Sequence, residues 1–227
     1  MTLIYRAFQL TLAALAFAAP ALAQSPVPFQ LSPDQSPRFE VAVQGGWLGV
    51  MAAARLTNGS RRYDTGTVEA SAAYFLTRHV RAGVAIGRSA GGRLFASEPI
   101  ATPDAPYQQW RYTEHIFRGT TIAPSIGYQF LDNRWVHPFV NAGVHLIHET
   151  HQQTTPFQSI PQRSPLPPIL LPATERTESS FRAIPFAGAG LNFYVHERSF
   201  IRTELQVARG AGDPLRAAWT FGVGFNF

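Results

Sequence analysis

The chain has 227 residues, no cysteine and a formal net charge of +5, and all 19 of its basic residues are arginine. It can therefore form no disulfide bond, and no basic run or basic-aromatic motif indicates nucleic-acid binding. No apolar run approaches the roughly 20 residues of a membrane helix. A content of 45% hydrophobic and 15% charged residues suits strands whose two faces differ in polarity.

Residues 1–23 are typical of a secretory signal peptide. Arg6 supplies the positive start, Leu10 to Ala19 the apolar core, and Ala21-Leu22-Ala23 a small-x-small cleavage site. Residues 24–37 carry four prolines, which cannot donate to a β-ladder, and this segment is predicted to be a periplasmic leader. The folded part is expected to occupy residues 38–227.

Period-2 alternation of large apolar residues with small or polar ones predicts a series of strands. In one of them Val84 and Ile86 share a face, while Arg81 and Gly83 share the other. Pro124 predicts a bulge or a local break in pairing. The first seven predicted strands lie at about 39–48, 65–76, 80–88, 117–130, 136–149, 180–194 and 200–208.

The last nine residues give the clearest alternation. Large apolar groups occupy positions 219, 221, 223, 225 and 227, with small or polar groups between them. An edge strand of a soluble sandwich can show this pattern, but five bulky apolar groups ending on Phe227 favour a strand that faces lipid.

The predicted connections alternate in length along the chain. Those after the second, fourth and sixth strands are tight turns, whereas 51–62, 89–114 and about 25 residues after the fifth strand are long. An even strand number with short and long connections at opposite ends predicts an all-β protein: an eight-stranded antiparallel up-and-down transmembrane β-barrel. A soluble jelly roll is the alternative, but the polar face of these strands makes a poor soluble core.

The final strand resembles the sorting signal at the C-terminus of bacterial outer-membrane barrels. The matching residues are Thr220, Gly222, Phe225 and Phe227. Residues 38–227 as a whole resemble the small eight-stranded barrels typified by the transmembrane domain of outer membrane protein A and by outer membrane protein W. The resemblance implies a bacterial outer-membrane location, contact with membrane lipid and lipopolysaccharide, passage through the barrel-assembly machinery, and a monomer.

Five charged residues share the inward parity of the predicted strands. Because barrels of this size fill their interior with side chains, we expect these charges to form a lumen ion-pair network. Glu40 is expected to reach Arg202, and Glu69 to extend the network toward Arg81. The leading hypothesis is a structural or surface-interaction barrel with a plugged lumen, and the alternative is a narrow porin-like channel for small or hydrophobic solutes. The five residues are Glu40, Glu69, Arg81, Arg202 and Glu204.

Neither a metal site nor an enzyme is favoured. His148-Glu149-Thr150-His151 has one residue too few for the zinc-protease motif, and His145 and His151 lie about 20 Å apart on a strand. A lipid-A-modifying enzyme is the third hypothesis, but His196-Glu197-Arg198-Ser199 lies at the turn end. The sequence therefore predicts no catalytic residue, cofactor or metal.

Two further expectations concern the ends of the barrel. Residues 153–178 are expected to be mobile, unpaired and outside the cell, with Pro165 to Pro172 either an unremarkable loop or an apolar patch that binds a partner or lipid. Aromatic residues near strand ends are predicted to form interfacial girdles. The girdle residues are Phe39, Tyr74, Phe130, Phe193 and Phe225 at the turn end, and Trp47, Phe117 and Trp219 at the other end.

Overall fold

The computed structural model describes residues 39–52, 61–100, 109–131, 135–162, 166–212 and 215–227. The predicted signal peptide and leader lie outside these residues. The described chain is built from strands, and none of it forms a helix long and apolar enough to cross a membrane. The strands are β1 (Phe39–Ala52), β2 (Arg61–Phe75), β3 (Val80–Ser89), β4 (Gly92–Ile100), β5 (Gln109–Gln129), β6 (Val136–Thr155), β7 (Gln158–Ile160), β8 (Ile169–Leu171), β9 (Thr174–Tyr194), β10 (Ser199–Ala208) and β11 (Arg216–Asn226).

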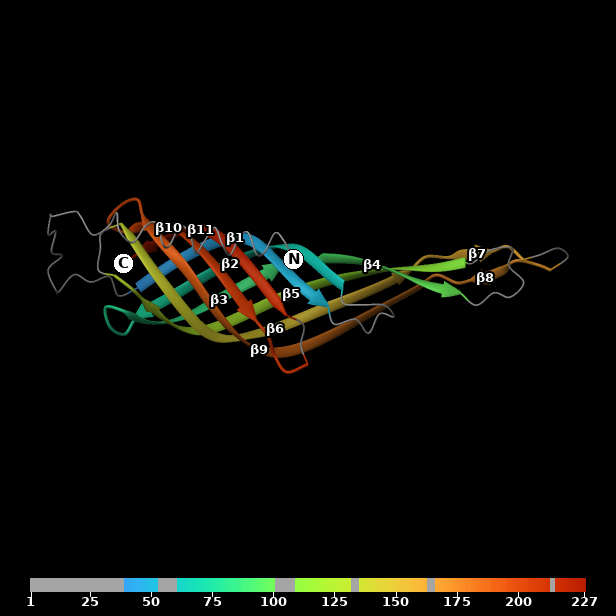
Figure 1. The fold of residues 1–227 in the computed structure, drawn as a ribbon, viewed down its shortest axis with the longest axis horizontal. Coiled ribbons are helices and arrows are strands. Elements are labelled where there is room, and N and C mark those ends of the chain that lie inside the picture. Colours follow the sequence, from blue (N-terminus) through green and yellow to red (C-terminus); the bar gives the residue numbers. More distant parts are fainter. Residues whose placement is uncertain (1–38, 53–60, 101–108, 132–134, 163–165, 213–214) are drawn as a thin grey trace. The chain divides into compact units, whose positions relative to one another are not determined.

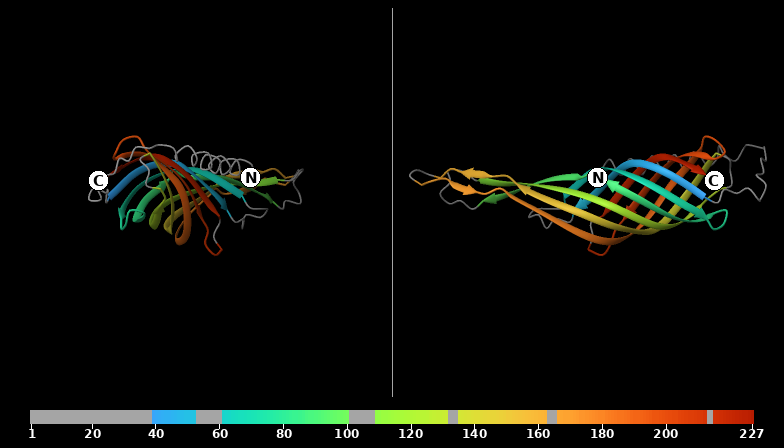
Figure 2. Two further views of the ribbon diagram at one scale, coloured as in Figure 1. Left: turned by 60° about the vertical axis from the view of Figure 1, so that its left-hand side comes forward. Right: turned by 180° about the vertical axis from the view of Figure 1, so that it is seen from behind.

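Eight of these strands close into an antiparallel ring, visible in Figures 1 and 2. The order around the ring is β1, β2, β3, β5, β6, β9, β10 and β11. β11 returns to β1 and pairs with it from Glu40↔Asn226 to Val50↔Arg216. Closure leaves the ring without an unpaired edge, as a barrel in lipid requires. The predicted all-β, eight-stranded antiparallel barrel is thus confirmed.

β4 continues the line of β3 past a bulge. Arg88 pairs with Thr120 of β5, and Gly92 resumes pairing with Phe117, so β3 and β4 together hold one more residue than β5 over this interval. Gly91 takes the strained position, with a φ of 114° that favours glycine. The bulge lets one edge of the sheet continue beyond the ring.

The predicted loop at 89–114 is wrong, because β4 and the start of β5 occupy most of it. β6 and β9 also run further than predicted, and they pair as far as Thr155↔Thr174. We call β4, β7, β8 and the parts of β5, β6 and β9 at residues 109–119, 149–155 and 174–180 the extension; Figure 1 shows it continuing past the ring. The apolar stripe ends at the ring, so alternation of hydrophobicity could not reveal these longer strands.

The expectation that residues 153–178 are unpaired is also wrong in part. β7 and β8 form their own two-stranded sheet through Gln158↔Leu171 and Ile160↔Ile169. Ile160 is fully buried. The prolines of this segment lie outside the two short strands, so they do not block the pairing.

Pro124 interrupts pairing without adding a residue. The β5–β6 register runs to Ile122↔Leu146 and resumes at Ser125↔Gly143, with the same offset on both sides. On the other side Pro124 still lies opposite Val84. Of the two predicted consequences, the local break occurs and the bulge does not.

The outer face of the ring is apolar and exposed, as the alternation predicts. Phe221, Val223 and Phe227 of the last strand segment are 59%, 61% and 63% exposed. A soluble protein does not leave such a stripe in water, whereas a barrel in lipid needs it. The exterior is therefore that of a membrane-spanning barrel.

Phe117 does not belong to the outer girdle. Its ring faces the interior and stacks on Tyr63 at 4.8 Å and on His151 at 4.4 Å between ring centroids. It lies on the opposite parity from outward Ile122, so the strand register excludes it from the girdle.

Candidate functional site in the lumen

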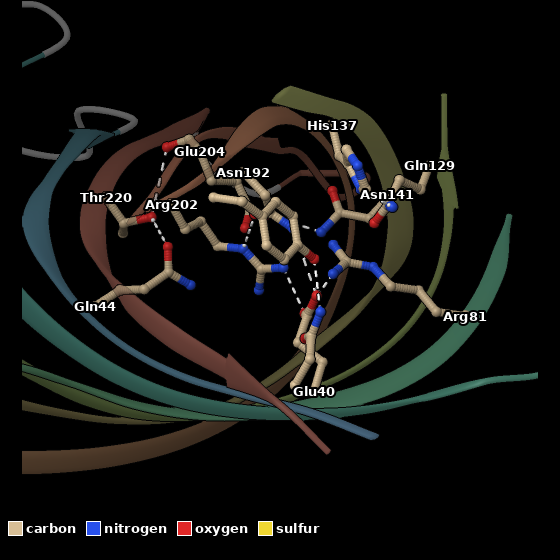
Figure 3. Close-up of polar contacts among 12 residues, drawn as sticks. Glu40, Gln44, Arg81, Gln129, His137, Asn141, Asn192, Arg202, Glu204 and Thr220 are labelled. Atoms are coloured by element: carbon tan, nitrogen blue, oxygen red, sulfur yellow. Dashed lines mark hydrogen bonds and ion pairs between the residues drawn. The ribbon is translucent and has the colours of Figure 1, made fainter. Parts of the chain in front are cut away.

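Glu40 of β1 lies at the centre of the lumen network. Its Oε1 accepts hydrogen bonds from Arg81 of β3 and Arg202 of β10, and all three side chains are buried. Figure 3 shows the two guanidinium groups converging on this carboxylate. Arg202 Nε also donates to Asn192 Oδ1 at 2.9 Å. One carboxylate thus ties three strands together across the interior.

Two phenylalanine rings complete this closure. The guanidinium carbons of Arg81 and Arg202 lie 4.5 and 4.8 Å from the centroid of Phe139, and Arg202 lies 5.2 Å from that of Phe200. Stacking on an aromatic face stabilises a desolvated cation. Gly190 makes room for Phe139, because a Cβ there would stand 2.6 Å from that ring. The plug is therefore both ionic and aromatic.

The other two predicted network residues, Glu69 and Glu204, line the same cavity as Arg81 and Arg202 but form no ion pair with them in the described part of the chain. Glu204 accepts hydrogen bonds from Asn141 Nδ2 and Gln206 Nε2, both at 2.8 Å. Glu69 forms no ion pair or hydrogen bond with Arg81 in the described part of the chain. Arg81 bonds to Glu40, and Glu69 lines the same cavity as Arg81 without a direct bond to it.

A second buried ion pair lies at the other end of the lumen. Arg216 Nη2 of β11 donates to Glu149 Oε2 of β6 at 2.7 Å. Sequence reasoning missed this pair, although Glu149 shares the inward parity of Asn141 and His145 on its strand. Its partner Arg216 was not recognised as inward-facing, because it precedes the residues 219–227 in which the last strand alternates clearly.

Two small cavities remain between the packed side chains. One of about 60 Å³ is lined by Thr65, Thr121, Glu149 and Arg216, among others. The second, of about 30 Å³, adjoins Glu40, Arg81 and Arg202. By this measure a water needs roughly 10–15 Å³, so the cavities hold a few waters each. Glu69 and Gln206 line both cavities.

The predicted assembly residues occupy the seam where the barrel closes. Thr220 is buried and its hydroxyl donates to Gln44 Oε1 at 2.9 Å. At Gly222 a Cβ would stand 2.0 Å from the carbonyl oxygen of Val43. Phe225 and Phe227 face outward with ring centroids 5.0 Å apart. Two of these residues thus pack the seam, and two extend the apolar exterior.

The end of Phe227 is held by the first strand. Its backbone N–H donates to the carbonyl of Phe39 at 2.8 Å, and the N–H of Phe39 donates back at 3.4 Å. This pair of hydrogen bonds completes the β1–β11 ladder at the turn end.

The three clustered histidines face different environments. His145 points inward, where its Nε2 hydrogen-bonds with Gln206 at 3.1 Å, and its ring lies 4.1 Å from that of Phe186. His148 points outward and is exposed. Within the described ranges no three His, Cys, Asp or Glu side chains are grouped so that they could hold a metal ion.

His151 belongs instead to a column of rings above the lumen, which we call the mouth stack. The stack runs from Tyr63 through Phe117 and His151 to His115, and neighbouring planes are within 17° of parallel. His151 Nε2 and His115 Nδ1 share a hydrogen bond of 2.9 Å. Burial lowers the pKa of His151, while Glu178 and Glu149 act in the opposite direction. A neutral His151 is therefore favoured.

The residues considered for lipid-A chemistry lie at the β9–β10 turn. His196, Glu197 and Arg198 are exposed there, and the turn is held by backbone hydrogen bonds between Val195, His196 and Ser199. Within the described chain, no hydrogen bond joins these side chains into a nucleophile–base pair. The prediction that the chain is not an enzyme remains a prediction.

No protein-family model and no curated protein matches the sequence. Among solved structures, the chain is similar to the N-terminal β-barrel domain of Pseudomonas aeruginosa OprF, with 18% identity, 85% of this chain and 100% of that chain covered, and a TM-score of 0.47. It is also similar to Ail, the attachment invasion locus protein of Yersinia pestis, at 12% identity, 84% and 99% coverage, and a TM-score of 0.48. Neisserial surface protein A is similar at 14% identity, 83% and 97% coverage, and a TM-score of 0.45. The assignment as an eight-stranded membrane barrel rests on the closed ring and its apolar exterior.

Proposed function

We propose that this chain is an integral protein of the bacterial outer membrane, secreted with a cleaved signal peptide, with a closed lumen and a structural or surface-interaction role. The observation that carries the proposal is the closure of the lumen by Glu40 with Arg81 and Arg202. An isolated buried ion pair gains little stability, because desolvation of the two charges offsets their attraction. Here Glu40 bonds to two arginines, Arg202 also bonds to the amide of Asn192, and both guanidinium groups pack on Phe139, so the plug should be stable.

The extension is the part of the protein that would be exposed at the cell surface. Bacterial barrels place short turns in the periplasm and longer connections outside the cell. By that rule the extension, which lies opposite the tight turns, faces the exterior. It presents exposed apolar rings, among them Phe95 at 66% and Tyr112 at 59%. Such rings are typical of interaction surfaces.

The proposal also includes the surroundings of the barrel. Membrane lipid and lipopolysaccharide contact its apolar band, the barrel-assembly machinery inserts it, and the ring needs no second copy for closure. Closure of the ring within one chain supports a monomer.

Two measurements on the wild-type protein, one on the purified barrel and one on whole cells, test this function. Planar bilayers should show little steady conductance through the wild-type barrel. Trypsin added to whole cells should cleave the sequence between β7 and β8, where Arg163 offers a site, while the β6–β9 ladder keeps the barrel intact. Large stable channels, or complete protection of the extension on cells that display the protein, would overturn the proposal.

A narrow channel is the second candidate, because both cavities share Glu69 and Gln206. Polar side chains therefore continue along the lumen from the plug toward Glu149 and Arg216. This function requires Arg81 or Arg202 to leave Glu40. Steady conductance in wild-type protein, selective for small solutes, would favour it.

A further inference from the structure

A row of polar residues marks where the apolar band ends on the outer surface. Arg88 of β3 lies opposite Thr120 of β5, which lies opposite His148 of β6. All three face outward and are exposed. One step toward the tight turns, the corresponding outward row is apolar, with Ile86 opposite Ile122 and Ile122 opposite Leu146.

Arg118 joins this row from one step further out. It is exposed on β5, and its Cγ and Nε lie 3.4 and 3.6 Å from where a Cβ of Gly91 would stand. The side chain therefore lies across the bulge, toward the strand that carries Arg88. Because Gly91 lacks a side chain, nothing on that residue displaces the arginine.

Neither arginine side chain has an anionic partner within the described part of the chain. By contrast, the nearby outward residue Arg93 pairs with Glu114 at 3.5 Å. Arg88 and Arg118 thus stand on adjoining strand positions, both exposed, immediately above a surface that must contact acyl chains. An anion at that level would be attracted by both guanidinium groups.

We propose that Arg88 and Arg118 form a binding site for the phosphate group of an outer-leaflet membrane lipid, whose acyl chains lie on Ile86 and Ile122. Guanidinium groups bind phosphate oxygens in a bidentate manner, and Thr120 and His148 extend the polar row beside them. A phosphorylated lipid satisfies both halves of the site, whereas a free anion uses only the arginines. This inference rests on the proposed outer-membrane function.

The test compares lipids that differ in phosphate. The purified full chain in detergent is titrated with bisphosphorylated lipid A and with its dephosphorylated form, and bound lipid is counted by native mass spectrometry. Each arginine near an anionic lipid surface contributes roughly a fivefold factor, so Arg88→Gln with Arg118→Gln should weaken lipid A binding roughly 30-fold. Arg78→Gln with Arg198→Gln, at exposed turns of the opposite end, removes the same charge and is the matched control.

Three outcomes decide the matter. The expected result is tight binding of bisphosphorylated lipid A only, lost in Arg88→Gln with Arg118→Gln and kept in Arg78→Gln with Arg198→Gln. Equal binding of dephosphorylated lipid A, or equal loss in the control, overturns the site. If inorganic phosphate at millimolar concentration displaces the lipid fully, the arginines are a simple anion site and the lipid inference fails. Membrane insertion, followed separately by heat-modifiable migration, shows whether the proposed function itself has failed.

Discussion

Arg216 and Glu149 face each other across the lumen and are joined by a 2.7 Å hydrogen bond between β11 and β6. Neither strand is the neighbour of the other in the ring. The pair lies beside the larger cavity, while Glu40 and its two arginines adjoin the smaller one. Buried ion pairs therefore cross the lumen at two levels, and removal of one pair leaves the other in place.

The ion pairs of Glu40 with Arg81 and Arg202 should contribute strongly to the free energy of unfolding of the barrel. Arg202→Ala leaves Glu40 with one cation and frees Asn192 Oδ1 from its donor. Removing one partner of a buried ion pair costs about 3–5 kcal/mol, so the free energy of unfolding should fall by about that amount. Urea unfolding of the refolded barrel in detergent measures this fall. Arg209→Ala, at an exposed position, should change it by less than about 0.5 kcal/mol; a similar effect of both variants would contradict the assignment.

Conductance should respond to the two closures together. We expect Arg202→Ala alone and Arg216→Ala alone to conduct little in planar bilayers, because each retains one ion-pair level. The double variant should show frequent openings. Arg78→Ala with Arg209→Ala removes the same charge from exposed positions and should remain closed. A fully open Arg202→Ala barrel would show that Arg216–Glu149 closes nothing.

The ring was predictable because lipid and lumen impose opposite chemistry on alternate residues. Val41 and Val43 of β1, for example, are 40% and 58% exposed, whereas Glu40 between Phe39 and Val41 is 2% exposed. That contrast is visible in the sequence wherever a strand crosses the band. Strand parity alone also placed Glu40, Arg81 and Arg202 inside.

The extension was not predictable by the same reasoning. Beyond the band the two faces no longer differ in polarity. In β4, buried Leu94 and Ala96 alternate with exposed Phe95, so apolar residues lie on both faces and the period-2 contrast in polarity is lost. The alternation along a strand shows which residues face the lumen. It does not show which of them contact each other, because the relative heights of residues on non-neighbouring strands cannot be derived from the sequence of either strand. For that reason Arg216 was not expected near Glu149.

Gly222 should be needed for close packing of β11 against β1, in addition to any role in the C-terminal sorting signal. In Gly222→Ala the new Cβ would stand 2.0 Å from the Val43 carbonyl oxygen and 2.6 Å from Gln44 Cα, so the β1–β11 seam must shift. Overpacking of this kind costs about 1–3 kcal/mol. Urea unfolding should show the loss in detergent, without any assembly machinery. At Gly45→Ala, where the nearest atom is 3.9 Å away, stability should hold; equal stability of both variants would refute the packing role.

Phe227 should act mainly during assembly in the cell. Deleting it removes an outward ring that is 63% exposed and one terminal pair of backbone hydrogen bonds. Refolding in detergent should therefore remain nearly normal, whereas the amount of heat-modifiable barrel in the outer membrane should drop severalfold. Removing the exposed ring of Phe95 from the extension, as Phe95→Ala, is the control and should leave membrane levels unchanged. Normal membrane levels after the deletion would exclude a role in sorting.

The mouth stack should loosen in acid. The pKa of His151 is lowered by burial from its ordinary 6.5, so the unfolded chain takes up a proton at a higher pH than the folded chain does. The stabilisation is therefore complete above about 6.5 and declines as the pH falls toward the lowered pKa. Once both rings are protonated, neither nitrogen keeps a lone pair, and His151 and His115 can no longer share their hydrogen bond.

Hydrogen–deuterium exchange, corrected for its intrinsic pH dependence, measures this loosening. Between pH 7.5 and 5, protection should fall in residues 109–119 of β5 and 149–155 of β6, while the ring strands near Glu40 stay protected. His151→Asn should show low protection at both pH values, since it lacks the titrating ring. His148→Asn, on the outward face, should behave like wild type. If protection in the wild type is the same at both pH values, the His115–His151 bond does not hold the extension together.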